Sequence, residues 1–114
     1  MVQGLLINVE LQKIQPIIAN NIQNIYAYIG NGCVSAESYR LPNGDYIIYD
    51  MGQFFQPPIG GFSQTDMNWL LMGNAVVIGY DPTTAEMSNS VSDPTTLLST
   101  ITFYDANYCE QAQK

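Results

Sequence analysis

Histidine is absent from the 114 residues, and cations are scarce. The missing histidines remove the commonest general base, the Ser-His catalytic arrangement and the usual zinc ligand sets. Lys13, Arg40 and Lys114 are the only cations, against ten acidic residues, so the net charge is -7. Three cations cannot build a groove that neutralises several phosphates, so we expect no direct nucleic-acid binding. Charge of this sign instead suits a basic protein partner.

Cysteines and long apolar runs are also scarce. The sequence shows no secretory leader and no run of about 18 apolar residues, so we expect a cytoplasmic protein without membrane association. Cys33 and Cys109 are then expected to be reduced and buried as small apolar side chains. A disulfide between them is the alternative.

The phosphate-binding motifs GxGxxG and GxxxxGK[ST] are missing as well. Asp45, Asp50 and Asp81 remain as carboxylates that strand ends could bring together, either to share a proton or to hold a metal ion. Each is more simply explained as a turn residue that bonds the local backbone. We therefore expect no catalytic residue, metal or cofactor, and a protein that is not an enzyme.

The pattern of apolar residues predicts a single domain over residues 1–114, with an α+β fold. Its sheet is expected to be small, antiparallel or mixed, with about four strands and two or three helices. The predicted strands are Gly4–Glu10, Cys33–Leu41, Tyr46–Tyr49 and Ala75–Tyr80, the last as a buried central strand, and Pro82–Val91 is predicted as a polar loop. The predicted helices are Pro16–Ile29, Thr65–Met72 and Pro94–Tyr108, with a strand at Leu98–Tyr104 as the alternative to the last.

The stretch RLPNGDYIIYDMG, residues 40–52, predicts a hairpin. Pro42 presets its backbone angle, and Asn43 and Gly44 tolerate positive φ, so the chain can reverse there. Asp45 is then a turn residue, and Asp50 ends the second strand.

The segment MGQFFQPPIGGFS, residues 51–63, is apolar but interrupted by proline and glycine. Its aromatic side chains are expected either to cap the core or to anchor a binding partner, with core packing favoured. Tyrosine is enriched, and tyrosines add amphipathic contact area. As a hypothesis, the binding residues are Phe54, Phe55, Ile59, Phe62, Tyr49, Trp69 and Arg40.

Two motifs, LPNGDYIIYDMG at residues 41–52 and MGNAVVIGYDP at residues 72–82, carry a resemblance. Together with the order of strand, helix and hairpin, they resemble a family of short phage and bacterial proteins known only as a domain of unknown function. That family tends to have an acidic pair before the glycine, where this chain has Asp50-Met51-Gly52. The resemblance implies a phage or prophage setting and brings no catalytic residues.

These observations predict a non-catalytic protein-binding or inhibitor module, phage-encoded and acting on a host protein, or a protein that associates with itself. The alternative is a protein that binds or sequesters a small, nucleotide-like molecule in a pocket, using backbone amides, tyrosines and Arg40.

Overall fold

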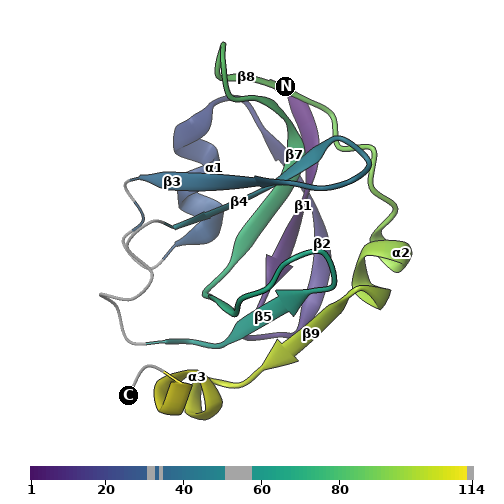
Figure 1. Cartoon of the computed structure of the whole chain (residues 1–114). Helices are drawn as coiled ribbons and strands as arrows, with labels where there is room; N and C mark the ends of the chain where they lie inside the picture. The colour runs from purple at the N-terminus through teal and green to yellow at the C-terminus, as the bar shows by residue number, and fades with distance from the viewer. Residues whose placement is uncertain (31–32, 34, 51–57, 113–114) are drawn as a thin grey trace.

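The structure, a computed structural model of the chain, describes residues 1–30, 33, 35–50 and 58–112. Its larger sheet has six strands in the order β2-β1-β7-β4-β3, with β8 paired to the far end of β7, and every pair is antiparallel (Figure 1). The strands are β1 (Val2–Asn8), β2 (Lys13–Ala19), β3 (Ala36–Arg40), β4 (Asp45–Asp50), β7 (Ala75–Asp81) and β8 (Glu86–Ser88). The fold is α+β, as predicted, but the sheet has six strands rather than about four.

The strand β7 lies at the centre of this sheet because its sequence is apolar on both faces. Five consecutive residues from Ala75 to Gly79 are buried, and β1 and β4 pair with its two edges. Gly79 is required by close packing, since a Cβ there would collide with Ser88 of β8. The prediction of a buried central strand is confirmed.

The strand β2 replaces the first half of the predicted helix. Its buried residues Ile17 and Ala19 alternate with exposed ones, which is the period of a strand. Pro16 is tolerated because β2 is an edge strand. The helix α1 (Ile22–Ile29) begins only where the Asn21 side chain accepts the Asn24 N–H.

A second, three-stranded sheet contradicts two further predictions. It has the order β6-β5-β9, formed by β5 (Gly61–Gln64), β6 (Leu71–Met72) and β9 (Ile101–Tyr104). The loop predicted up to Ser63 therefore includes a strand, and the predicted helix Thr65–Met72 is a turn followed by a strand. Pairing with β5 overrode the local helix signals, because so short a helix is weak alone.

The C-terminal segment divides into α2 (Pro94–Ser99), β9 and α3 (Ala106–Ala112) rather than one helix. Asp93 caps α2 and Pro94 occupies its first turn, as predicted. The β-branched residues from Thr100 to Thr102 end the helix, and β9 confirms most of the alternative strand.

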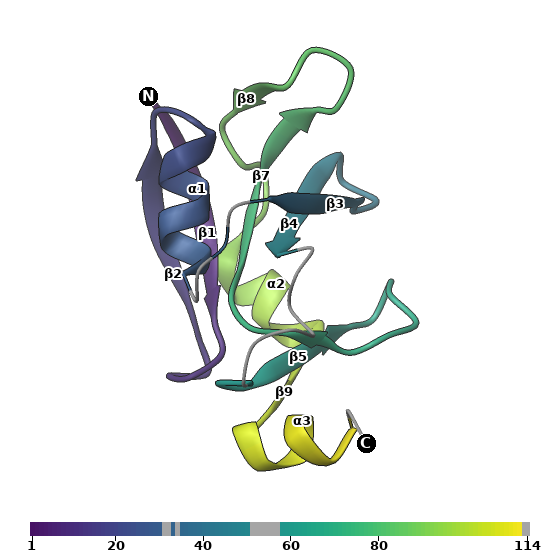
Figure 2. The same ribbon diagram turned by 90° about the vertical axis from the view of Figure 1, so that its left-hand side faces the viewer.

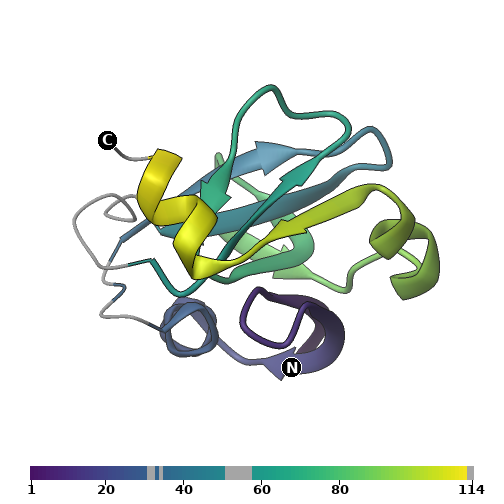
Figure 3. The same ribbon diagram turned by 90° about the horizontal axis from the view of Figure 1, so that it is seen from below.

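The two faces of the larger sheet are covered by different elements. On one face lies α1, which packs on β2, β4 and β7 (Figure 2). Its Ile25 and Ile29 are buried in the core on that face, and Figure 3 shows the helix end-on. On the other face, the smaller sheet and α2 add Phe62, Leu71 and Leu97 to a second core. The turn after β3, the turn after β5 and the helix α2 build the candidate site.

Candidate functional site

An aromatic pair, the exposed Trp69 and the half-buried Tyr39, lies at the edge strand β3. Trp69 is 42% exposed, and its ring meets that of Tyr39 edge to face, with the centroids 5.4 Å apart. Tyr39 lies on β3 opposite Ile47, so its side chain is on the face covered by the smaller sheet. Its hydroxyl donates to the main-chain oxygen of Asp66. We call Tyr39, Asp66 and Trp69 the Trp69 surface.

The turn that carries Trp69 is anchored to the core by Met67. The turn before Trp69 is closed by the Met67 N–H, which donates to the Gln64 carbonyl over 2.8 Å. Met67 is buried in the core, while Trp69 two residues later points outward. A large aromatic side chain fixed in this way loses little entropy when a partner covers it.

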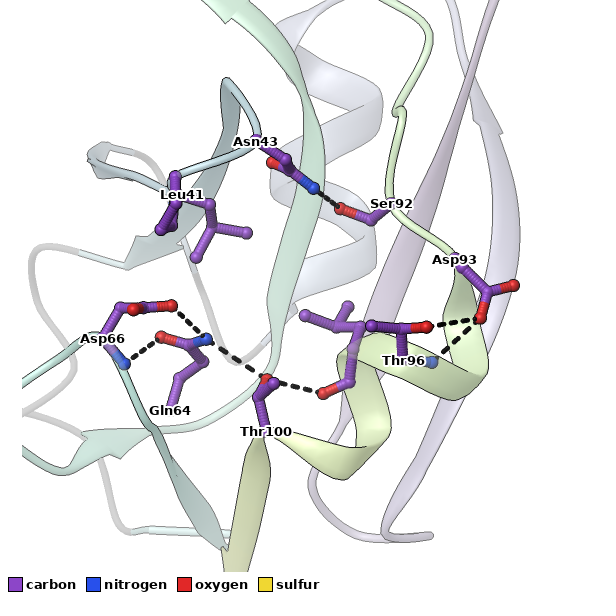
Figure 4. A pocket seen from close by; sticks show the side chains of 10 residues that line it. Leu41, Asn43, Gln64, Asp66, Ser92, Asp93, Thr96 and Thr100 are labelled. Carbon is purple, nitrogen blue, oxygen red and sulfur yellow. Dashed lines mark hydrogen bonds between the residues drawn. The ribbon is translucent and has the colours of Figure 1, made fainter.

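Next to this surface lies a pocket of about 160 Å³, which Figure 4 shows from close by. The hairpin turn after β3, the start of the turn after β5, and α2 form its walls. On one wall, the Gln64 side-chain amide donates to Asp66 over 2.9 Å and to Thr100 over 3.2 Å. The lining residues are Leu41, Pro42, Asn43, Gln64, Asp66, Ser92, Asp93, Thr96, Leu97 and Thr100.

Acidic groups dominate the electrostatics of this pocket. Asp66 and Asp93 both line it, and none of the lining residues is a cation. The main-chain N–H and the hydroxyl of Thr96 hydrogen bond to Asp93 and hold the pKa of its carboxyl below the usual value. The pocket therefore favours a positively charged group with an apolar stem, such as a lysine or arginine side chain.

Asp45 fixes the far wall of the pocket. It is 1% exposed, and its carboxylate accepts hydrogen bonds from both Ser90 and Ser92 hydroxyls, each over 2.6 Å. The main-chain N–H groups of Val91 and Ser92 donate to it as well, over 3.1 Å. Asp45 therefore anchors the segment that leads into α2, and the expectation of a simple turn residue is wrong.

The predicted binding residues are only partly brought together. Tyr49 lies on the same sheet face as Tyr39, and its hydroxyl donates to Glu37 over 3.2 Å. Burial, then the Glu37 carboxylate, raises the pKa of Tyr49. Arg40 pairs with Tyr46 on the opposite face, so it is separated from Trp69.

The predicted apolar loop contributes little to this surface. Phe62 is fully buried in the core and is unavailable to a partner, which corrects its assignment as a binding residue. Ile59 is half-buried and packs against the same core. Phe54 and Phe55 lie outside the described residues.

The three aspartates considered as a joint site are not all brought together, because Asp45 and Asp81 line one hollow and Asp50 does not. Asp45 and Asp50 begin and end β4, so they are separated by roughly 16 Å at the rise of an extended strand. Within the part of the chain that the structure describes, no three acidic, cysteine or histidine residues are grouped to hold a metal ion.

Both cysteines are free. Burial, then the charge of Asp50, raises the pKa of the Cys33 thiol to about 11. Burial, then Asp105, also raises the pKa of Cys109. Both groups are thus neutral thiols near neutral pH, a weakly nucleophilic state.

Sequence reasoning missed Tyr39, Asp66 and the Asp45 network. The alternation of residues in the predicted strand Cys33–Leu41 does place Tyr39 on the same face as Glu37. The face of Tyr39 could therefore be predicted, but its partner could not. No local pattern predicts the hydrogen bond from the Tyr39 hydroxyl to the main-chain oxygen of Asp66, because the two residues are 27 positions apart.

A second hollow, of about 610 Å³, lies over β1 and β2 beside the segment that Asp45 anchors. Its lining residues are Gln3, Gly4, Leu5, Pro16, Ile17, Ile18, Tyr28, Ser90 and Ser92, which carry no charge. Its size is that of a small-molecule site, but it offers a nucleotide-like anion no cation.

No family model matches this chain, and no curated protein or solved structure is significantly similar to it. None of the helices among the described residues has the length and apolarity needed to cross a bilayer.

Proposed function

We propose that this chain is a non-catalytic protein-binding module, phage-encoded, that inhibits or redirects a host protein. The observation that carries the proposal is the exposed Trp69, whose ring meets that of Tyr39 edge to face. Tyr39 in turn bonds to Asp66, which lines an acidic pocket. Tryptophan and tyrosine are the residues most enriched at the energetic centres of protein interfaces.

The charge of the surface supports a basic partner. The pocket beside Trp69 contains Asp66 and Asp93, and the whole chain carries -7. A partner can use both features at once, if it places an apolar side chain on Trp69 and a lysine or arginine in the acidic pocket. Complementary charge of this kind increases the rate of encounter and selects among partners.

The first prediction tests this surface with the purified protein as bait in a host-cell lysate. The wild type and a Trp69→Ala variant are compared, and Tyr108→Ala is the matched control, because Tyr108 is also an exposed aromatic residue, at 53%, on helix α3. We expect at least one basic protein to be enriched by the wild type and by Tyr108→Ala, and lost with Trp69→Ala. Quantitative mass spectrometry of the eluates measures this.

Two further measurements make that result decisive. The melting temperature of Trp69→Ala should stay close to the wild-type value, since the ring is largely outside the core. An identical set of proteins on all three baits would contradict the proposal, and so would a loss of binding in both aromatic variants.

The alternative function is binding of a small molecule, favoured by the hollow over β1 and β2. Since its lining is neutral, an uncharged ligand fits better than a nucleotide. Mass spectrometry of molecules released on denaturing the purified protein distinguishes the two functions. A stoichiometric small molecule, combined with no differential protein capture, would replace the first proposal by the second.

A further inference from the structure

The edge strand β3 leaves its outer main-chain groups open. The Leu41 N–H donates to the Asp45 carbonyl over 2.7 Å, which marks residues 41 and 45 as a hydrogen-bonded pair of the β3–β4 ladder. Because such pairs alternate along antiparallel strands, Tyr39 and Glu37 also bond to β4. The N–H and C=O groups of Ala36, Ser38 and Arg40 therefore point away from the sheet.

The opposite edge of the sheet is protected in ways that β3 is not. β2 and β3 lie on opposite sides of the larger sheet (Figure 2). Pro16, in the middle of β2, has no N–H to offer, and the Tyr28 hydroxyl donates to the Ile18 carbonyl over 3.0 Å. Proline and occupied carbonyls are devices that prevent a second chain from pairing at an edge. β3 contains no proline, and no described hydrogen bond covers its outer groups.

We propose that β3 is a dimerisation edge, at which a second copy of this chain adds its own β3 in antiparallel orientation. A two-fold axis at Ser38 aligns the strands over their full length. Ser38 then faces Ser38 of the second copy, and Ala36 faces Arg40 in both directions. These are three hydrogen-bonded pairs, each exchanging two N–H···O bonds, and they join the two larger sheets into one.

The charges on β3 disfavour two of the neighbouring registers. Moving the axis to residue 37 would place Glu37 opposite itself, and moving it to Arg40 would place the two guanidinium groups together, which is unfavourable between neighbouring strands. With the axis at Ser38, Glu37 faces Tyr39. Arg40 of one copy lies beside the small Ala36 of the second copy. Ala36 pairs with Asp50 inside the second copy. Asp50 of the second copy therefore lies on the same sheet face as Arg40, one strand further on. Opposite charges thus approach across the junction.

The dimer displays two Trp69 surfaces on one face of the joined sheet. Tyr39 lies on the same sheet face in each copy, on either side of the axis. Two linked binding surfaces raise the apparent affinity for a partner that is itself repeated. The dimer does not depend on that partner, so the two ideas are tested separately.

Sedimentation or light scattering of the purified protein over a wide concentration range tests the dimer. Ser38→Pro removes the central outward N–H without removing a bond to β4, and should weaken the dimer roughly tenfold or more. Ile18→Pro is the matched control, because it makes the same change at the outer side of β2. A monomer at every concentration, or a dimer that is weakened equally by both variants, would overturn the proposal.

Cysteine cross-linking tests the register, in a Cys33→Ser background with a mild oxidant that accepts the two thiol electrons. Ser38→Cys places the two thiols at a hydrogen-bonded pair, where the Cα atoms are about 5.5 Å apart and within disulfide range. We expect a rapid intermolecular disulfide there and slow cross-linking for Arg40→Cys, whose thiol faces Ala36. The reverse order would reject this register. Trp69→Ala should leave the dimer intact, so failure of the partner proposal would not affect this result.

Discussion

Cys33 shows how a single residue's surroundings decide its chemistry. A free thiol on the surface is partly ionised and reactive at mildly alkaline pH. In this chain, burial and the neighbouring Asp50 carboxylate both oppose the thiolate. The thiol is therefore a packing group beside the core between α1 and the larger sheet, and its ionisation is linked to folding.

The pKa of Cys33 predicts a pH dependence of stability. The folded thiol ionises at about 11, whereas the ordinary value is 9.0. Its stabilising effect is therefore fully present below pH 9 and is lost as the pH rises to about 11, because the unfolded chain releases the proton first. The difference in unfolding free energy between wild type and Cys33→Ala should shrink from pH 9 to pH 11 in urea titrations. A constant difference would contradict the assignment.

At the scale of the element, the β3–β4 hairpin depends on one backbone conformation. The Gly44 N–H donates to the Leu41 carbonyl over 3.0 Å, and Gly44 has a φ of 97°. Side chains rarely adopt that angle, although the space around the Gly44 Cα is open. The strain of any replacement is therefore a property of the backbone rather than of packing.

Replacing Gly44 measures that strain. Gly44→Val should lower the free energy of unfolding by about 1 kcal/mol or more, because a β-branched residue is poorly accommodated at positive φ. Gly44→Asn is the control and should lose less, since asparagine tolerates this region. Equal stability of all three proteins in thermal denaturation would show that the turn does not need the positive φ.

At the scale of the whole molecule, separate layers are connected by buried polar contacts as well as by apolar packing. Asp45 begins β4 and receives four donors from residues 90–92, which lead from the larger sheet to α2. The Asn43 side chain adds a bond to Ser92 over 2.9 Å. This connection positions α2 against the pocket beside the Trp69 surface.

Substituting Asp45 tests this connection. Asp45→Asn replaces an acceptor oxygen by a donor that faces donors, and should lower the free energy of unfolding by about 1–3 kcal/mol. Asp81→Asn is the matched control, because Asp81 is exposed and the one described hydrogen bond of its carboxylate, from the Thr83 N–H, survives the change. Denaturant titrations compare the two. A loss no larger than that of the control would mean that the segment 90–92 is held without the carboxylate.

The sequence alone determined the elements whose causes are local. The apolar run of β7, the Asp93-Pro94 start of α2 and the Asn43-Gly44 turn each depend on neighbouring residues only, and each is found where it was predicted. The α+β class follows from the same patterns. Composition alone likewise argues against two kinds of chemistry without reference to the fold. The charge balance disfavours direct nucleic-acid binding, and the missing histidines disfavour histidine-based catalysis and the usual zinc sites.

Tertiary structure decided everything that depends on distant pairing. β2, β5 and β6 are strands because β1 and the smaller sheet offer partners to segments whose local signals favoured a helix or a loop. The burial of Phe62 and the exposure of Trp69 follow from that pairing, because both rings are apolar enough to be placed in the core. The candidate site joins β3 to a turn 27 positions away, and only folding brings Tyr39 and Asp66 into contact.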